Sequence, residues 1–257
     1  MGKQCYFDNK HPQQGALAVN GLCYLYPEAV RELTHSWRAT KGWTKFSIVQ
    51  EGQPVPLQFL ACMSAKMREA NTPKSVIAAD CVDIAADGYL REQDLFSLRV
   101  CDVILTDSHA TLLLGRGDRG EGCKSGRDQG VVMDEPHSYD ILCRAIAGKK
   151  PDDRVFPISQ MDYGNLWRKT AKELTGDPRA AGTPHSARHT GASRDLTEGY
   201  RNLEQVMKRG RWKALNSVHR YAKPHAWYAA LASLPQELRQ QGDAILALRA
   251  PRPKTAV

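Results

Sequence analysis

Apolar side chains recur at helical spacing along most of the chain after residue 55. Leu57, Leu60, Met63 and Met67 lie three or four positions apart, which predicts a helix with one face in the core. The segment 74–86 predicts a second, more uniformly apolar helix. Further helices are predicted over 94–98, 138–147, 162–175, 184–198, 202–209, 214–222 and 235–248. The last of these is expected either to pack back on this chain or to pass to a neighbouring subunit.

Three short segments between these helices favour strands instead. The segments 100–105, 110–114 and 129–133 are rich in valine, isoleucine and leucine, and a loop with five glycines, 115–126, separates the last two. They predict a small three-stranded antiparallel sheet with a long cationic hairpin tip. Helices, a small sheet and then more helices indicate an α+β domain that is mainly helical, because the alternating pattern of a parallel sheet is missing.

The first 55 residues contain frequent proline and glycine and are expected to be mainly loop, with one short helix within 27–40. The stretch 37–45 interleaves two tryptophans with three cations, which suits either contact with a phosphate backbone or anchoring of an arm on the main domain. The predicted organisation is a short N-terminal segment (1–55), a main domain (56–228), and a C-terminal helix and tail (229–257).

The net charge indicates the kind of partner that the protein binds, and the cysteine content indicates the compartment in which it is found. With 36 Lys and Arg against 28 Asp and Glu, the net charge is +8, and nine cations against three acids fall within 183–228. A polyanionic partner is therefore favoured. No apolar run of 18 residues predicts a membrane span. Seven scattered cysteines without a secretory leader predict a reducing compartment, nuclear in a eukaryote or cytoplasmic in a prokaryote, and no metal site.

The segment 183–193 contains the first candidate chemistry. Thr183 is expected to cap a helix that begins at Pro184, which places His185 and Arg188 three residues apart on one face. A guanidinium can bind two phosphate oxygens and an imidazole can move a proton. Trp212 follows Arg188 by 24 residues and Tyr221 follows nine later. A tyrosine hydroxyl is a weak nucleophile near pH 7, so it needs such a base and such cations.

From His185 to Tyr221 the chain resembles the tyrosine recombinase (phage integrase-like) family. The family pattern is His-x-x-Arg, then Gly-His or Gly-Trp, then a tyrosine nine residues on; here one extra residue stands between Gly210 and Trp212. The run 88–98 resembles the family's upstream arginine motif, again with one extra residue. The similarity covers about 56–225. Trp212 and the run Arg-Tyr-Ala-Lys at 220–223 look more like crypton-type or related mobile-element recombinases than phage integrases.

The resemblance implies a complete set of site residues. Tyr221 is the implied nucleophile, His185 the base, and Asp94 the buried structural partner of the first arginine. The implied catalytic residues are Arg91, Lys124, His185, Arg188, Trp212 and Tyr221. Lys149 and Lys150 are alternatives to Lys124, and His189 is an alternative base. Cations expected to contact DNA are Arg127, Arg194, Arg209, Arg211, Lys213 and Arg220.

The implied activity is DNA integration or site-specific recombination through a 3′-phosphotyrosyl intermediate, without cofactor or metal. The expected partners are double-stranded DNA and further copies of the chain, as a tetramer on DNA. Family members carry a longer DNA-clamping domain than 1–55 can hold, so we expect weak, salt-sensitive DNA binding. Two alternatives stay open: a catalytically silent DNA-binding protein derived from a mobile element, and a type IB topoisomerase-like swivelase.

Overall fold

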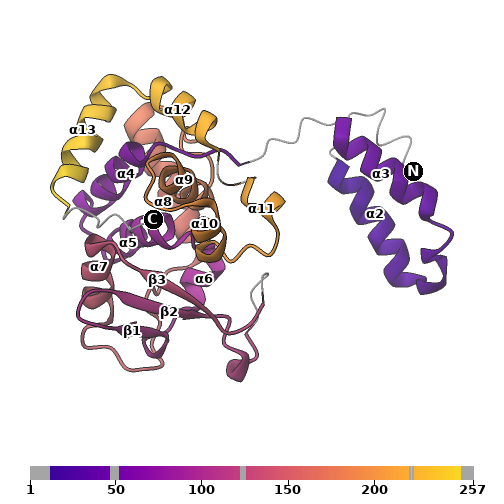
Figure 1. Cartoon of the computed structure of the whole chain (residues 1–257), viewed down its shortest axis with the longest axis horizontal. Coiled ribbons are helices and arrows are strands. Elements are labelled where there is room, and N and C mark those ends of the chain that lie inside the picture. The colour runs from indigo at the N-terminus through magenta and orange to yellow at the C-terminus, as the bar shows by residue number, and fades with distance from the viewer. Residues whose placement is uncertain (1–11, 47–51, 122–125, 220, 222, 250–257) are drawn as a thin grey trace. The chain divides into compact units, whose positions relative to one another are not determined.

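The chain divides into two compact units, Met1–Glu51 and Gly52–Val257. The structure is a computed structural model, and it describes residues 12–46, 52–121, 126–219, 221 and 223–249 (Figure 1). Among these residues, no helix combines the length and the apolar character that a membrane crossing needs.

The described part of the first unit, residues 12–46, is a helical hairpin. Its helices are α2 (Pro12–Leu25) and α3 (Thr34–Phe46), and the short 3₁₀ helix η1 (Pro27–Val30) lies between them. The prediction of a mainly looped segment was therefore wrong. Gly15 does not break α2, because it makes room for α3: a Cβ at this position would lie 2.8 Å from the ring of Trp43.

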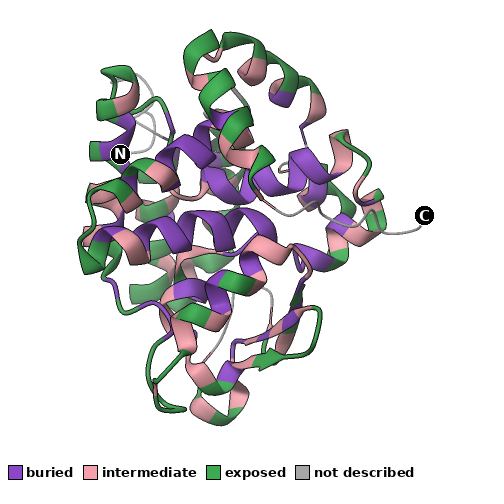
Figure 2. Cartoon of the chain, turned by 90° about the vertical axis from the view of Figure 1, so that its left-hand side faces the viewer, coloured by how far each residue is buried: buried purple, intermediate pink, exposed green. Residues whose placement is uncertain are grey.

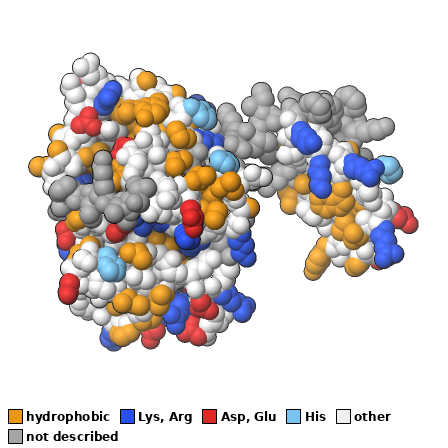
Figure 3. All heavy atoms as spheres, in the orientation of Figure 1, with side chains coloured by type: hydrophobic (Ala, Val, Ile, Leu, Met, Phe, Trp, Pro, Cys, Tyr) orange, Lys and Arg blue, Asp and Glu red, His pale blue; other side chains and the backbone are white. Residues whose placement is uncertain are grey.

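Much of the apolar surface of this hairpin is exposed. Figure 3 shows hydrophobic side chains gathered on the first unit, with lysines and arginines beside them. The exposed large apolar residues of the unit are Leu17, Leu22, Tyr24, Leu25, Tyr26 and Val30. The two helices described, α2 and α3, are too few to enclose these side chains between them.

The second unit is built around the buried helix α5 (Pro73–Gly88). Thr72 caps α5 by accepting a hydrogen bond from Ser75 N, and Pro73 occupies the first helical position, where its missing N–H costs nothing. Buried residues, purple in Figure 2, gather in the central helices of the unit. The helices with the most contacts to α5 are α4 (Leu57–Glu69), α7 (Pro136–Ile146), α8 (Gln160–Thr175) and α9 (Ser186–Thr197).

A three-stranded antiparallel sheet joins this helical core on one side. Its strands are β1 (Val103–Leu105), β2 (Ala110–Leu114) and β3 (Gln129–Met133), in the order β1-β2-β3. Leu112, Val131 and Met133 point into the core, whereas Val132 is exposed on the outer face. The 3₁₀ helices η2 (Val100–Asp102) and η3 (Gly117–Arg119) flank the sheet. The predicted strand over 100–105 is therefore shorter than expected, because its first half is η2.

The remaining helices lie near the ends of the core. They are α6 (Glu92–Ser97), α10 (Leu203–Arg209), α11 (Leu215–His219), α12 (Pro224–Ser233) and α13 (Gln236–Ala247). The prediction lacked α12, although Pro224 stands at its first position, where proline starts a helix rather than stopping one. The C-terminal helix α13 packs back on α4 of the same chain, where Gln58 Nε2 donates to Asp243 Oδ1 at 3.0 Å.

The crossing of α9 over α5 has no space for a side chain at Gly191. A Cβ there would lie 1.9 Å from the carbonyl oxygen of Ala86 and 2.8 Å from the ring of Tyr89. Backbone atoms cannot rotate away as a side chain can. The helix that carries His185 and Arg188 is thus held directly on the backbone of the central helix.

We expect Gly191→Ala to lower the free energy of unfolding by about 3 kcal/mol or more, because the methyl group forces the two helices apart. Urea denaturation measures this change. Gly164→Ala on α8 is the matched control: its Cβ would meet only Arg168 Nη1, at 3.8 Å. It should be neutral or stabilising by up to about 1 kcal/mol. Equal stabilities of the two variants would contradict the proposed close approach.

Candidate active site

A tight turn precedes α9 and places the two predicted residues at its start. Ser186 N donates to Thr183 O at 2.8 Å, and Arg188 N donates to His185 O at 3.2 Å. The predicted cap at Thr183 is wrong: His185 holds the N-cap position and makes no side-chain cap bond. His185 is partly exposed, and Arg188 is fully buried one turn further on.

The Arg188 guanidinium is bonded to backbone carbonyl oxygens. Nη1 donates to Tyr89 O, and Nη2 donates to Gly210 O at 2.6 Å. The guanidinium carbon also lies 4.7 Å from the centre of the Trp212 ring and 5.2 Å from that of Tyr221. Arg188 Nε has no hydrogen-bond acceptor among the described residues. A buried donor without an acceptor is uncommon and marks this site as suited to an anion.

Tyr221 lies over this arginine and beside two histidines, His185 at the N-cap of α9 and His189 within α9. Its hydroxyl is 3.4 Å from His185 Nε2, and its ring stacks on the His189 ring with 4.4 Å between centroids. The Trp212 ring lies against it at 4.7 Å. Ser193 Oγ donates to Tyr221 O at 2.8 Å, which fixes the backbone of the tyrosine on α9. The structure thus brings together residues from three separate parts of the sequence.

The turn that ends α10 carries Trp212 into the site. Arg211 N donates to Lys208 O and Trp212 N to Met207 O, the bond pair of a Schellman motif. Its left-handed position usually holds glycine, but here it holds Arg211, with φ of 55°. Gly210 instead makes room for the indole, since a Cβ on it would lie 2.0 Å from the Trp212 ring. The residue inserted relative to the family pattern is therefore the left-handed residue of this turn.

Asp94 links the upstream motif to this turn. It is buried, and its Oδ2 accepts from Arg91 N at 3.0 Å and from Arg211 Nη2 at 2.6 Å. Arg91 is the N-cap residue of α6 and is partly exposed. Arg211 Nη2 also lies 3.5 Å from Tyr89 O, which Arg188 shares. Three arginines and one carboxylate therefore meet at one place.

The electrostatics of this cluster favour a bound anion. Burial, and then the like charges of Arg91 and Arg211, lower the pKa of the Arg188 guanidinium to about 9. The neighbouring Arg209 behaves in the opposite way. Burial opposes its charge too, but the carboxylates of Asp87 and Asp134 raise the pKa of Arg209. The difference lies in the partners, since Arg188 has carbonyl oxygens where Arg209 has carboxylates.

A buried network of arginines and carboxylates, which sequence reasoning missed, lies behind the site. Asp195 on α9 accepts from Arg194 Nη2 at 2.9 Å and from Arg201 Nη1 at 2.7 Å, and also from the Tyr89 hydroxyl. Arg201 and Arg209 both reach Asp134 after β3. The consecutive Arg194-Asp195 pair was a visible sequence signal for such a network.

The predicted DNA-contacting cations fall into different settings. Three of them are buried and form ion pairs with carboxylates: Arg194, Arg209 and Arg211. Two others, Arg127 and Lys213, are exposed. Lys124 and Arg220 lie outside the described residues. The alternative lysine Lys149 is bound to the backbone, because its ammonium donates to Arg154 O and Val155 O.

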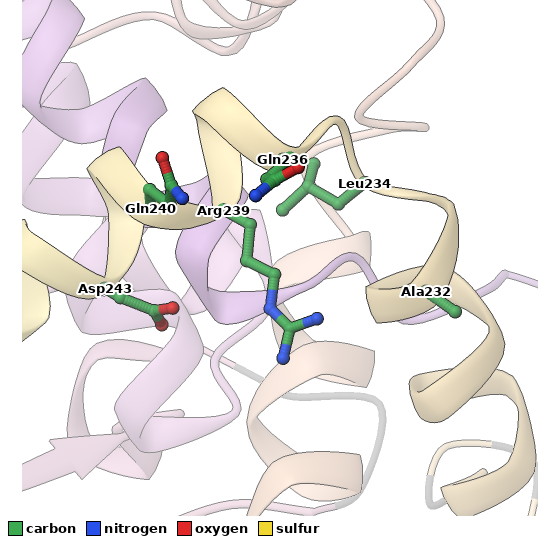
Figure 4. Close-up of a pocket in the computed structure, with 6 residues that line it drawn as sticks. All are labelled: Ala232, Leu234, Gln236, Arg239, Gln240 and Asp243. Carbon is green, nitrogen blue, oxygen red and sulfur yellow. The ribbon is translucent and has the colours of Figure 1, made fainter.

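Two other features bear on where a ligand could bind. No group of three or more metal-binding side chains exists in the described part of the chain. A pocket lies between α12 and α13, lined by Ala232, Leu234, Gln236, Arg239, Gln240 and Asp243 (Figure 4). It contains none of the predicted site residues, so we assign it no part in the site.

Comparison with known proteins identifies the fold. No protein-family model and no curated protein matches the sequence. Among solved structures, the Tn1549 transposon integrase (residues 82–397) with circular intermediate DNA is similar: identity is 14%, the match covers 91% of this chain and 82% of that chain, and the TM-score is 0.57. The XerH site-specific recombinase in its pre-cleavage complex with difH has 14% identity, covering 74% of this chain and 56% of that one, with a TM-score of 0.51.

The chain thus spans just over half of the XerH chain in that complex. At this identity the likeness shows the fold alone. It confirms the predicted fold class, a mainly helical α+β unit with a small antiparallel sheet, which these recombinase and integrase structures share.

We expect sulfate to stabilise the protein, by about 1.4 kcal/mol at ten times its Kd, beyond the effect of sodium chloride at equal ionic strength. The folded-state pKa of Arg188, about 9, lies below its ordinary value, so the stability cost of burying its charge is full below pH 9 and declines as the pH rises above 9. Sulfate offsets this cost, so its effect should be largest below pH 9 and decline above it.

Thermal melts of the wild type and Arg188→Met at several pH values measure this effect. The sulfate effect should largely disappear in Arg188→Met. Arg168→Met, which alters an exposed arginine on α8, should retain the full effect. Identical sulfate shifts in all three proteins would show that Arg188 has no part in an anion site.

Proposed function

We propose that this protein is a DNA strand transferase, a tyrosine recombinase that acts in site-specific recombination or integration. The observation that carries the proposal is the position of the Tyr221 hydroxyl, 3.4 Å from His185 Nε2 and beside a buried arginine. The similar structures support it, because the XerH recombinase is bound there to its difH substrate and the Tn1549 integrase to transposon circular intermediate DNA.

The first step of the proposed reaction is attack of the Tyr221 oxygen on a backbone phosphorus. His185 Nε2 accepts the phenolic proton as the new P–O bond forms. Negative charge grows on the non-bridging oxygens, and Arg91 and Arg188 stabilise it. The Trp212 indole N–H adds one donor, since it is buried and has no acceptor among the described residues.

The second half of the step releases the 5′ oxygen. In this proposal Lys124 donates a proton to that oxygen as its bond to phosphorus breaks, which leaves a 3′-phosphotyrosyl bond at Tyr221. The phosphodiester energy is kept in that bond, so a 5′ hydroxyl of another strand can attack it without ATP. In this proposal the guanidinium groups stabilise the negative charge on the phosphate, so the reaction requires no metal ion or cofactor.

Entry of the phosphate requires a rearrangement at Tyr221. Arg188 is fully buried, with the rings of Trp212 and Tyr221 over its guanidinium. These two rings cover part of the guanidinium that the phosphate is proposed to reach. We infer that DNA first meets the partly exposed Arg91, and that the ring of Tyr221 shifts as the phosphate enters.

Double-stranded DNA is the proposed partner, held by exposed cations around the site. Arg127 and Lys213 are exposed and suited to phosphate contacts. We remove Arg194 and Arg209 from the proposed contacts because both guanidinium groups are buried on carboxylates. Assembly as a tetramer on DNA remains part of the proposal. So does the division into a short N-terminal segment, a catalytic domain and a C-terminal helix.

A pool of nicked duplexes of random sequence tests the proposal, since the nick lets the departing strand diffuse away and traps the adduct. We expect the wild type to form an SDS-resistant adduct, and Tyr221→Phe to reduce it by about a thousandfold because the nucleophile is gone. Tyr228→Phe changes an exposed tyrosine on α12 and should stay within about twofold of the wild type.

An adduct that persists in Tyr221→Phe would exclude this nucleophile. Duplex binding without any adduct would instead support the silent DNA-binding alternative. Relaxation of supercoiled DNA without joining of two duplexes would support the swivelase.

A further inference from the structure

Arg211 occupies a backbone position that ordinarily excludes it. Its φ of 55° is the left-handed conformation, which crowds any residue with a Cβ, and glycine is the usual occupant at this point of a helix end. Gly210 stands directly before it in the right-handed conformation. An arginine at the strained position indicates that its side chain has a role of its own.

The Arg211 side chain is 3% exposed and joins two parts of the site. Its Nη2 donates to Asp94 Oδ2 at 2.6 Å, and the same oxygen accepts from Arg91 N. Nη2 also lies 3.5 Å from Tyr89 O, the carbonyl oxygen to which Arg188 donates. Arg211 therefore contacts Asp94, which binds Arg91, and Tyr89 O, which binds Arg188. Arg91 and Arg188 are the two arginines proposed to hold the phosphate.

The charges explain what this contact does. Arg91, Arg188, Arg211 and Asp94 together carry a net formal charge of +2. Asp94 is 3% exposed, and a buried carboxylate needs a cation. Without Arg211 the cluster would fall to +1, and Asp94 would draw Arg91 or Arg188 toward itself. Either arginine would then be lost to an incoming phosphate.

We propose that Arg211 is a positioning residue: it binds Asp94 and so keeps this carboxylate from competing with the anion for Arg91 and Arg188. This inference rests on the proposed function, because the anion meant is the backbone phosphate that is cut. It also revises the sequence-based expectation for Arg211, because Nη2 of its guanidinium binds the buried carboxylate of Asp94.

The test compares Arg211→Gly with the double variant Arg211→Gly, Asp94→Asn. Glycine suits the left-handed backbone, so the single variant removes the side chain without straining the turn. Asparagine keeps an oxygen that can accept from Arg91 N. In the single variant, Arg91, Arg188 and Asp94 remain, with a net formal charge of +1. In the double variant the charge of Asp94 is also gone, so Arg91 and Arg188 give +2.

Two quantities are measured in each protein: the Kd for sulfate, from thermal melts, and the rate of adduct formation on nicked duplexes. We expect Arg211→Gly to weaken sulfate binding and slow adduct formation by about tenfold or more, with duplex affinity within about threefold. The double variant should recover both quantities to within about threefold of the wild type.

Wild-type sulfate affinity in Arg211→Gly would overturn the inference. So would a double variant as weak as the single one, since Arg211 would then contact the anion directly or act only through the turn. If Arg211→Gly does not fold, the double variant alone tests the inference. A sulfate Kd within about threefold of the wild type would support it, and weaker binding would contradict it. A wild type that forms no adduct contradicts the proposed function, while the sulfate measurements still decide the role of Arg211.

Discussion

The positive charge of Arg188 is buried in the interior of the protein. Among the described residues, its guanidinium donates hydrogen bonds to backbone carbonyl oxygens and to no carboxylate. The geometry of the site depends on this constraint. Each carbonyl must come from a residue at a helix end: Tyr89 follows α5 in the left-handed conformation, and Gly210 ends α10. Because α9 lies directly on α5 at Gly191, the guanidinium reaches both oxygens at once.

The carboxylate network on the other side of Tyr89 makes this arrangement stable. Asp195 accepts from the Tyr89 hydroxyl and from two arginines, and Arg209 binds Asp87 at the end of α5. The arginines thus have two kinds of surroundings. Those on carboxylates hold helix ends together, and their charge is neutralised within the protein. Arg188 is held by neutral oxygens, so its charge remains to attract an anion.

The sequence predicted much of this fold, because apolar spacing determines helices and strands locally. The strands over 110–114 and 129–133 lie at the predicted positions, and α8 begins within two residues of its predicted start. The errors came from residues whose role depends on a distant partner. Gly15 suggested a loop, because nothing in the sequence places Trp43 against it. Arg194 and Arg209 suggested a DNA surface, because Glu135, which binds Arg194, and Asp87 and Asp134, which bind Arg209, are remote from them in the sequence.

The sequence predicted which residue types form the candidate site. It did not predict which of the charged side chains neutralise one another. The side chains of His185, Arg188, Trp212 and Tyr221 lie together, and the roles that the resemblance implies for them stay predictions. The role of Arg211 could not be predicted, because it follows from a left-handed turn and from contacts with Asp94 and Tyr89. An inserted residue in a motif gives no sign of the direction of its side chain.

The most direct measurement of the central claim is a crystal structure of the Tyr221→Phe variant bound to duplex DNA. We expect one backbone phosphate to accept hydrogen bonds from the Arg188 guanidinium and the Trp212 indole N–H, next to the ring of residue 221. A structure in which the DNA binds while Arg188 stays enclosed, bonded only to the carbonyl oxygens of Tyr89 and Gly210, would contradict this claim.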